Sequence, residues 1–143
     1  MNNSTKLTST HASLLPPDPF RQKIVIELGC TIMTKWQLKD YDQFKLTGLQ
    51  NRFEFQMWKQ KAFSVLTPEV YVRLAALVEL NRLLKRASSS PEQTSIWLNT
   101  PNPAFDLDSP LTHMLAHGLR GIQNICTALY SGEQQYLHTT FLH

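Results

Sequence analysis

A chain of 143 residues, 42% of them apolar and 17% charged, has the size and composition of one folded domain, or of two very small ones that share a core, which excludes disorder throughout. No apolar run approaches the ~20 residues of a membrane-spanning helix, and the N-terminus lacks a secretion signal, so we expect a cytoplasmic protein with no membrane partner. Charge is uneven, because residues 1–90 carry thirteen Lys or Arg against seven Asp or Glu, whereas residues 91–143 carry one against four.

The chain opens with a polar arm, residues 1–19, whose last four positions include three prolines. Proline disrupts a continuing helix, so we expect the folded part to begin near Phe20. From Phe20 to Trp36 the apolar residues mostly follow the spacing of a buried helical stripe, with Gly29 as its weak point. A strand over residues 23–28 is the alternative. The residues expected to face inward are Ile24, Ile26, Leu28, Ile32, Met33 and Trp36.

Two short helices joined by a glycine turn follow. We expect the first over residues 39–46 and the second over residues 50–61, because Gly48 can take the left-handed conformation that ends helices. This is the outline of a helix-turn-helix, whose second helix enters the major groove of DNA. Against DNA contact, Phe44 stands where such motifs commonly carry a small residue, and Glu54 would repel phosphate. The polar residues expected to contact DNA are Gln50, Asn51, Arg52, Gln56 and Lys59.

The clearest helix start in the chain is Thr67-Pro68-Glu69. It combines a threonine N-cap, a proline at the first helical position and a carboxylate near the positive end of the helix dipole. We expect a helix over residues 68–86 that joins the two halves of the chain. Its expected inward residues are Val70, Leu74, Leu77, Val78 and Leu84, and its expected water-facing residues are Arg73, Glu79, Arg82, Lys85 and Arg86.

Residues 88–132 contain three further helix signals. Ser90 and Gln93 fit a capping box, in which each side chain bonds the backbone near the other. A Ser-Pro pair starts the next helix and Gly118 ends it, and an amphipathic helix begins at Leu119. The apolar residues expected to be buried in these three helices are, in turn, Ile96, Trp97 and Leu98; Leu111, Met114 and Leu115; and Ile122, Ile125, Cys126 and Leu129.

The sequence offers no positive support for catalysis, a metal or a cofactor. Cys30 and Cys126 belong to no metal or redox motif, so buried free thiols are favoured and a disulfide stays open. His113 and His117 lie four apart, a spacing that can grip a metal, but neither a metalloprotease glutamate nor an obvious third ligand accompanies them, which favours a structural or solvent-facing role. Phosphate-loop, dinucleotide and nucleophile-elbow motifs are absent.

Four short motifs follow one another in the last third of the chain. They are Trp97-Leu98, the run T-P-N-P-A-F at residues 100–105, Ser-Pro-Leu at residues 109–111, and Gly118 with the amphipathic helix behind it. Their order and spacing resemble the toxin-binding domain of the Xre/MbcA/ParS antitoxins. The middle third, which ends in L-T-P-E and an R-L-A-A-L helix within residues 66–77, resembles the Xre-like helix-turn-helix domain of the same family.

The resemblance implies an all-α antitoxin that pairs with a RES-domain toxin, an enzyme that consumes NAD. Such an antitoxin dimerises, covers the active site of the toxin and represses its own promoter by binding operator DNA. The implied organisation is an arm (1–19), an Xre-like domain (20–87), a toxin-binding domain (88–132) and a C-terminal tail (133–143). The expected toxin-binding residues are Asn102, Phe105, Tyr136, Leu137 and Phe141.

The last three of these residues lie in the tail, which can insert aromatic anchors into a toxin pocket or be a frayed or folded-back terminus. Two other functions also stay open. One is a stand-alone transcriptional regulator that uses the C-terminal module for dimerisation, and the other is an adaptor whose helix-turn-helix binds no DNA.

Overall fold

The computed structural model describes residues 18–133, which form seven α-helices and no strand, so the predicted all-α fold is confirmed. None of these helices is long and apolar enough to cross a bilayer. The helices are α2 (Pro19–Lys35), α3 (Asp40–Thr47), α4 (Arg52–Lys59), α5 (Pro68–Ala87), α6 (Pro91–Leu98), α7 (Pro110–His117) and α8 (Leu119–Ala128), with a 3-10 turn at Pro103–Phe105 and a π-helical turn at Leu129–Glu133.

Most of these helices begin where the sequence signals predict. Side chains accept hydrogen bonds from first-turn backbone N–H groups, which otherwise lack partners inside the helix. In the capping box, Gln93 differs from the prediction, because its Oε1 accepts from Ser89 N at 3.0 Å rather than from Ser90 N. The side-chain caps of α2, α4, α5, α6 and α7 are Asp18, Asn51, Thr67, Ser90 and Ser109.

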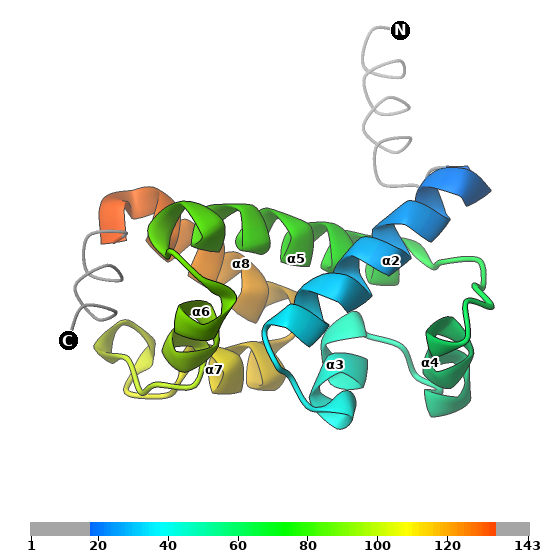
Figure 1. Ribbon diagram of the computed structural model, residues 1–143. Coiled ribbons are helices and arrows are strands. Elements are labelled where there is room, and N and C mark those ends of the chain that lie inside the picture. The colour runs from blue at the N-terminus through cyan, green and yellow to red at the C-terminus, as the bar shows by residue number, and fades with distance from the viewer. Residues whose placement is uncertain (1–17, 134–143) are drawn as a thin grey trace, which may run out of the picture.

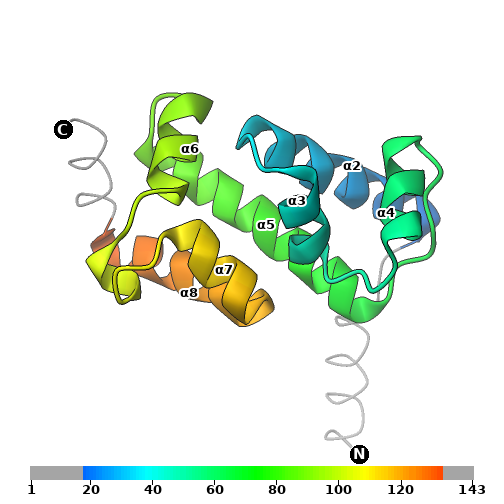
Figure 2. The ribbon, with the colours of Figure 1, turned by 90° about the horizontal axis from the view of Figure 1, so that it is seen from below.

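Helix α5 lies at the centre of the packing, because α2, α3, α6 and α8 all contact it (Figure 1). Seen from below, α2, α3 and α4 lie to one side of it and α7 and α8 to the other, with α6 beside one end of α5 (Figure 2). Helices α2 and α8 both pack along α5, α7 packs on α8, and α3 also contacts α7. The helix-turn-helix half therefore meets the C-terminal half directly as well as through α5.

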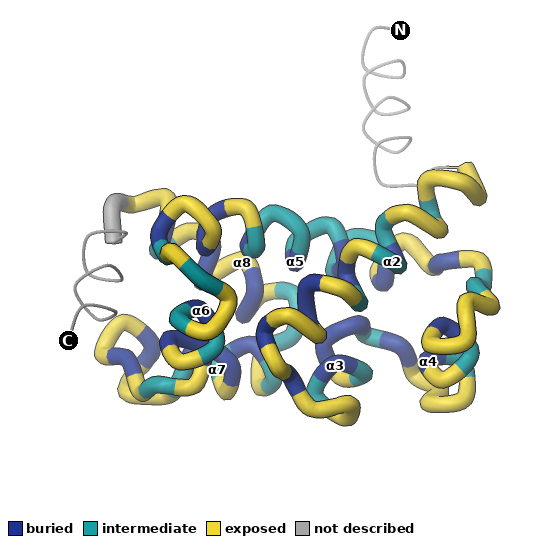
Figure 3. The backbone as a smooth tube through the Cα atoms, in the orientation of Figure 1, coloured by how far each residue is buried: buried dark blue, intermediate teal, exposed yellow. Residues whose placement is uncertain are grey.

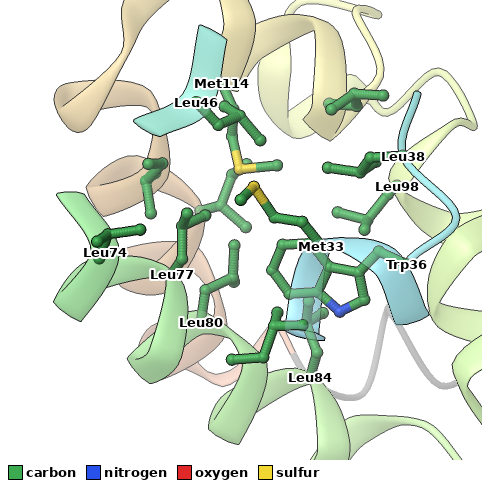
Figure 4. Close-up of a cluster of buried hydrophobic side chains, with 14 of the residues drawn as sticks. Met33, Trp36, Leu38, Leu46, Leu74, Leu77, Leu80, Leu84, Leu98 and Met114 are labelled. Carbon is green, nitrogen blue, oxygen red and sulfur yellow. The ribbon is translucent and has the colours of Figure 1, made fainter. Parts of the chain in front are cut away.

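One hydrophobic core runs across the predicted domain boundary. In Figure 4, Met33 and Leu46 from the first half lie in the same cluster as Leu98 and Met114 from the second, against the leucines of α5. The fully buried Leu80 on α5, which periodicity alone did not single out, belongs to this cluster. The division at residue 87 stays a prediction, because nothing in this core separates two domains.

The predicted inward face of α2 is partly wrong. The strand alternative is wrong as well, since residues 23–28 are helical. Ile26 is fully buried, but Ile24 is 40% and Leu28 is 46% exposed. At 100° per residue, Ile24 lies about 200° around the helix from Ile26, so a helix that packs on one side cannot bury both. The exposed side of α2 is visible in Figure 3.

Two further predictions, the burial of Ile96 and the length of α4, differ from the structure. Ile96 was expected to be buried with Trp97 and Leu98, but it is 63% exposed, because three consecutive residues cannot share one helix face. Helix α4 is shorter than the predicted 50–61, since Asn51 caps its start and Lys61 takes a left-handed φ of 66° beyond its end.

The α7–α8 crossing leads to a first prediction, for Gly121. A Cβ on Gly121 would lie 2.7 Å from the carbonyl oxygen of His113 and 2.9 Å from Met114 Cα, both backbone atoms of α7. We expect Gly121→Ala to lower the free energy of unfolding by about 1–3 kcal/mol, although alanine favours helices. Urea denaturation measures this. Gly29→Ala is the control: its Cβ would meet only the Leu74 side chain, so a smaller loss is expected. A G121A variant as stable as the parent would contradict the close backbone approach.

Candidate functional site

The helix-turn-helix geometry comes from a well-packed turn between α3 and α4. Gly48 has φ +81°, the left-handed conformation predicted for it. The buried Thr47 donates from Oγ1 to the carbonyl oxygen of Phe44 at 2.6 Å and accepts from Leu49 N at 3.1 Å. Phe55 on α4 is buried in the core. The turn and the inner face of α4 are therefore fixed, and the outer face of α4 is open to a partner.

The five predicted DNA-contacting residues all lie exposed at this outer surface. Two of them serve the local fold: Asn51 caps α4 by accepting from Phe53 N at 2.8 Å, and Gln50 Nε2 donates to the carbonyl oxygen of Gly48 at 3.4 Å. The guanidinium of Arg52 stacks over the rings of Tyr41 and Phe44, 5.5 and 5.9 Å from their centroids. Phe44 therefore supports the position of Arg52.

Asp40, at the start of α3, contacts the other two predicted DNA-binding residues, Gln56 and Lys59. Lys59 Nζ lies 2.5 Å from Asp40 Oδ1, and Gln56 Nε2 donates to Asp40 Oδ2 at 3.4 Å. These hydrogen bonds, that of Lys59 first, hold the pKa of Asp40 below its usual value. Nineteen residues separate Asp40 from Lys59, so no local sequence pattern predicted the pair. A carboxylate thus neutralises the one lysine on α4.

Arg73 was expected to face water, and this prediction is wrong. Its side chain is only 19% exposed and pairs with Glu69 at 3.3 Å. A Cβ on Gly48 would lie 2.7 Å from Arg73 Cδ, and one on Gly118 would lie 3.0 Å from Arg73 Nη1. The guanidinium is therefore held between the α3–α4 turn and the α7–α8 turn. It joins the two halves at a place that neither half's sequence pattern reveals.

The residues that carry the resemblance build one packed unit. Trp97 and Leu98 are buried between α6 and the rest of the core. Ser109 caps α7 by accepting from Thr112 N at 3.1 Å. Gly118 begins α8 with φ +58°. Most of these positions are therefore explained by the scaffold of the C-terminal half.

Asn102 and Phe105, the described toxin-binding candidates, are both buried, at 5% and 7% exposure. Asn102 Oδ1 accepts from Ala104 N at 2.9 Å, and its carbonyl oxygen accepts from both Phe105 N and Leu107 N at 3.0 Å. Asn102 N donates to the carbonyl oxygen of Asp108 at 3.1 Å, which closes the loop. The two side chains shape this loop, whose other residues include the exposed Asp106, Leu107 and Asp108. Tyr136, Leu137 and Phe141 lie outside the described residues.

Where the described chain ends, a polar cluster anchors the π-helical turn. The hydroxyl of Tyr130 donates to Glu79 Oε2 on α5, and Arg82 Nη2 donates to that hydroxyl at 3.3 Å. Arg82 also pairs with Glu79 at 2.7 Å. These partners lie about fifty residues apart in sequence, which is why sequence reasoning missed them. The cluster holds the π-helical turn at Leu129–Glu133 against α5.

Both cysteines are free thiols, as favoured from the sequence. Burial raises the pKa of Cys126 to about 11 and raises that of the half-buried Cys30. A thiol that stays protonated at neutral pH is a poor nucleophile and metal ligand. Within residues 18–133, no group of three or more His, Cys, Asp or Glu side chains is placed to hold a metal ion.

His113 is half-buried against Phe105, with ring centroids 5.1 Å apart, and its Nε2 lies 3.0 Å from Asn124 Nδ2. Burial lowers its pKa below 6.5, His117 lowers it further, and Asp108 and Asp106 act in the opposite direction. The folded state therefore takes up this proton less readily than the unfolded state, and stability is lost as pH falls below 6.5.

We accordingly expect urea denaturation to show a falling free energy of unfolding from about pH 7.5 to about pH 5.5, a window above the titration of ordinary carboxylates. In the His113→Gln variant this dependence should shrink. An NMR titration that places the pKa of His113 at or above 6.5 would contradict the assignment.

Comparison of the chain with protein-family models, with curated proteins and with solved structures finds no match in any of the three.

Proposed function

We propose that this protein is a cytoplasmic, homodimeric antitoxin of the Xre/MbcA/ParS type that neutralises a RES-domain, NAD-consuming toxin by binding it. The observation that carries the proposal is the unit made by α6, the Asn102 loop, α7 and α8. The motifs behind the resemblance form one scaffold, in which Trp97 packs in the core, Asn102 closes a loop and Gly118 contacts Arg73. Such agreement between motif and packing supports a shared fold.

The anchored π-helical turn supports a route to neutralisation. Tyr130 ties the end of the described fold to α5 through Glu79 and Arg82. A tail that leaves a fixed point loses less orientational freedom on binding than one on a loose end. In the proposal, the aromatic and leucine side chains of residues 134–143 enter the toxin's substrate pocket while the helical unit rests on its rim.

Growth rescue tests this function. The proposal predicts that a RES-domain protein is encoded beside this chain, and this protein is induced alone, with the full chain, or with the chain ending at Glu133. We expect the first to arrest growth, the second to restore it and the third to fail, with the truncated chain's circular dichroism and melting temperature as the folding control. Failure of the full chain to restore growth would sink the proposal, whereas rescue by the truncated chain would refute only the role of the tail.

Autoregulation by operator binding is part of the proposal, and the geometry of α3 and α4 supports it. The Asp40 cluster favours a second candidate instead, an adaptor that binds no DNA, because Lys59 and Gln56 are engaged and Glu54 stands on α4. Fluorescence anisotropy with the chain's upstream DNA decides between them. Specific binding that weakens steeply with salt would support the antitoxin-repressor, and weak binding equal for all sequences would support the adaptor.

A further inference from the structure

The loop after the 3-10 turn contains two consecutive residues in a conformation that suits glycine. Asp106 has φ +54° and ψ +35°, and Leu107 has φ +70°. Side chains with a Cβ clash with the backbone in this region, and leucine gains nothing there from the short polar side chain that helps asparagine or aspartate. The chain therefore holds an apolar residue at a position where glycine would be less strained.

The surrounding structure enforces this conformation. The carbonyl oxygen of the buried Asn102 accepts from Leu107 N at 3.0 Å, and Asp108 N donates to the carbonyl oxygen of Phe105 at 2.9 Å. Phe105 is buried beneath the loop and packs on His113. A loop with this many internal bonds offers its outer residues in one geometry, which lowers the entropy lost on binding.

The loop exposes an apolar side chain, that of Leu107, between two carboxylates. Leu107 is 67% exposed, and Asp106 and Asp108 on either side of it are also exposed. Within residues 18–133 neither carboxylate forms an ion pair, and both partly oppose the lowering of the pKa of His113 by burial. A partner that covers this loop has to offer an apolar pocket for the leucine and cationic groups for the carboxylates, because burying an unpaired charge is costly.

The loop requires this backbone conformation but not a leucine in it, because glycine could form the same backbone hydrogen bonds and the leucine side chain is 67% exposed. An exposed apolar side chain kept at a strained position points to a role in binding. We propose that Leu107 is an anchor residue that inserts into an apolar pocket rimmed by lysine or arginine on the partner protein. The inference rests on the proposed function, so the partner is the RES-domain toxin. The contact proposed for the Leu107 loop and the contact proposed for the tail involve different segments of the chain, so variants can test them separately.

The test compares three variants of the full chain with the parent. Leu107→Gly removes both the strain and the anchor, and Leu107→Met keeps an apolar side chain of similar size. Val65→Ala is the matched control, an exposed apolar residue between α4 and α5, outside the unit proposed to meet the toxin. Affinity for the purified RES-domain protein is measured by titration calorimetry, and folding by the melting temperature. Growth rescue with the same partner is recorded in parallel.

For Leu107→Gly we expect a melting temperature equal to or above that of the parent, together with a dissociation constant raised at least about tenfold. L107M and V65A should bind within about threefold of the parent. The Asp106→Asn, Asp108→Asn double variant should show a dissociation constant that depends less on salt.

Each other outcome counts against a specific statement. If L107G binds as tightly as the parent, Leu107 is not an anchor, even where growth rescue by the parent upholds the proposed function. If L107G melts at a lower temperature, the argument from strain is wrong. If the parent chain itself neither binds nor neutralises the RES-domain protein, the proposed function fails and this inference fails with it.

Discussion

Truncating Trp97 to alanine is expected to lower the free energy of unfolding by about 3–5 kcal/mol, most of the stability of an ordinary small domain. The side chain is 4% exposed and packs in the core shared by both halves. Its loss opens a cavity where α6 is held in place, so neutralisation would be lost through unfolding. Urea denaturation followed by circular dichroism measures the effect.

Trp97→Phe is the informative companion. The indole Nε1 of Trp97 is buried without a hydrogen-bond partner in the described structure, so its removal relieves an unsatisfied donor. We expect this variant to stay within about 1.5 kcal/mol of the parent. Trp58→Phe is the contrast: Trp58 Nε1 donates to Ser64 Oγ at 3.1 Å, and losing that bond adds about 1 kcal/mol. A loss of stability from W97F as large as that from W58F would contradict the unpaired state of the Trp97 indole nitrogen.

The second large effect concerns DNA. Asp40→Asn is expected to tighten binding of the upstream DNA by about tenfold at low salt, because it removes a negative charge from the α3–α4 surface and frees Lys59 and Gln56 for phosphate. The slope of the logarithm of affinity against the logarithm of salt concentration should steepen by about one unit, as expected for one added phosphate contact. Fluorescence anisotropy across a salt series measures both quantities.

Asp42→Asn is the matched control. Asp42 also lies in the first turn of α3 but has no ion pair with α4 in the described structure. It carries the same change of net charge, so a tenfold gain from D40N with little change from D42N would assign the effect to the Asp40–Lys59 pair. Equal gains in DNA affinity from D40N and D42N would mean that the effect comes only from the change in net charge. No binding by any variant would favour the adaptor.

Local signals account for what the sequence predicted well. Threonine, serine and proline at helix starts and glycine at helix ends act within one turn of the chain, so the bounds of α5, α6 and α7 and the turn at Gly48 follow from neighbouring residues. Apolar spacing predicted the buried face of α8, including Ile122 and Ile125. Where an element packs on one side with a regular stripe, periodicity is sufficient.

Tertiary packing decides the remainder, and it joins residues that no local pattern connects. Helix α5 is covered from two sides, so Leu80 and Leu83 are buried in addition to the predicted stripe. The sequence pattern of α5 places Arg73 on the surface, but in the fold the turns at Gly48 and Gly118 both contact its side chain. Asp40 with Lys59, and Tyr130 with Glu79, depend on how helices cross. The exposed Leu107 owes its position to a backbone conformation that its residue type does not favour.

The shared core has a consequence for how the protein would work. Because Leu46 and Met114 lie in one cluster and Arg73 contacts both turns, the helix-turn-helix half and the C-terminal half are packed against each other. A toxin bound at the Leu107 loop and DNA bound at α4 would then be held in a fixed relation. The proposed antitoxin therefore needs no linker motion to carry both partners.

The account predicts that a RES-domain protein is encoded beside this chain. The most direct measurement for the central claim is NAD consumption by that purified protein, with and without an equimolar amount of the full chain. The account predicts that NAD loss falls to the background rate when the two proteins are mixed, and that the Leu107→Gly variant at the same concentration inhibits less. NAD loss that continues unchanged beside a folded, full-length chain would contradict it.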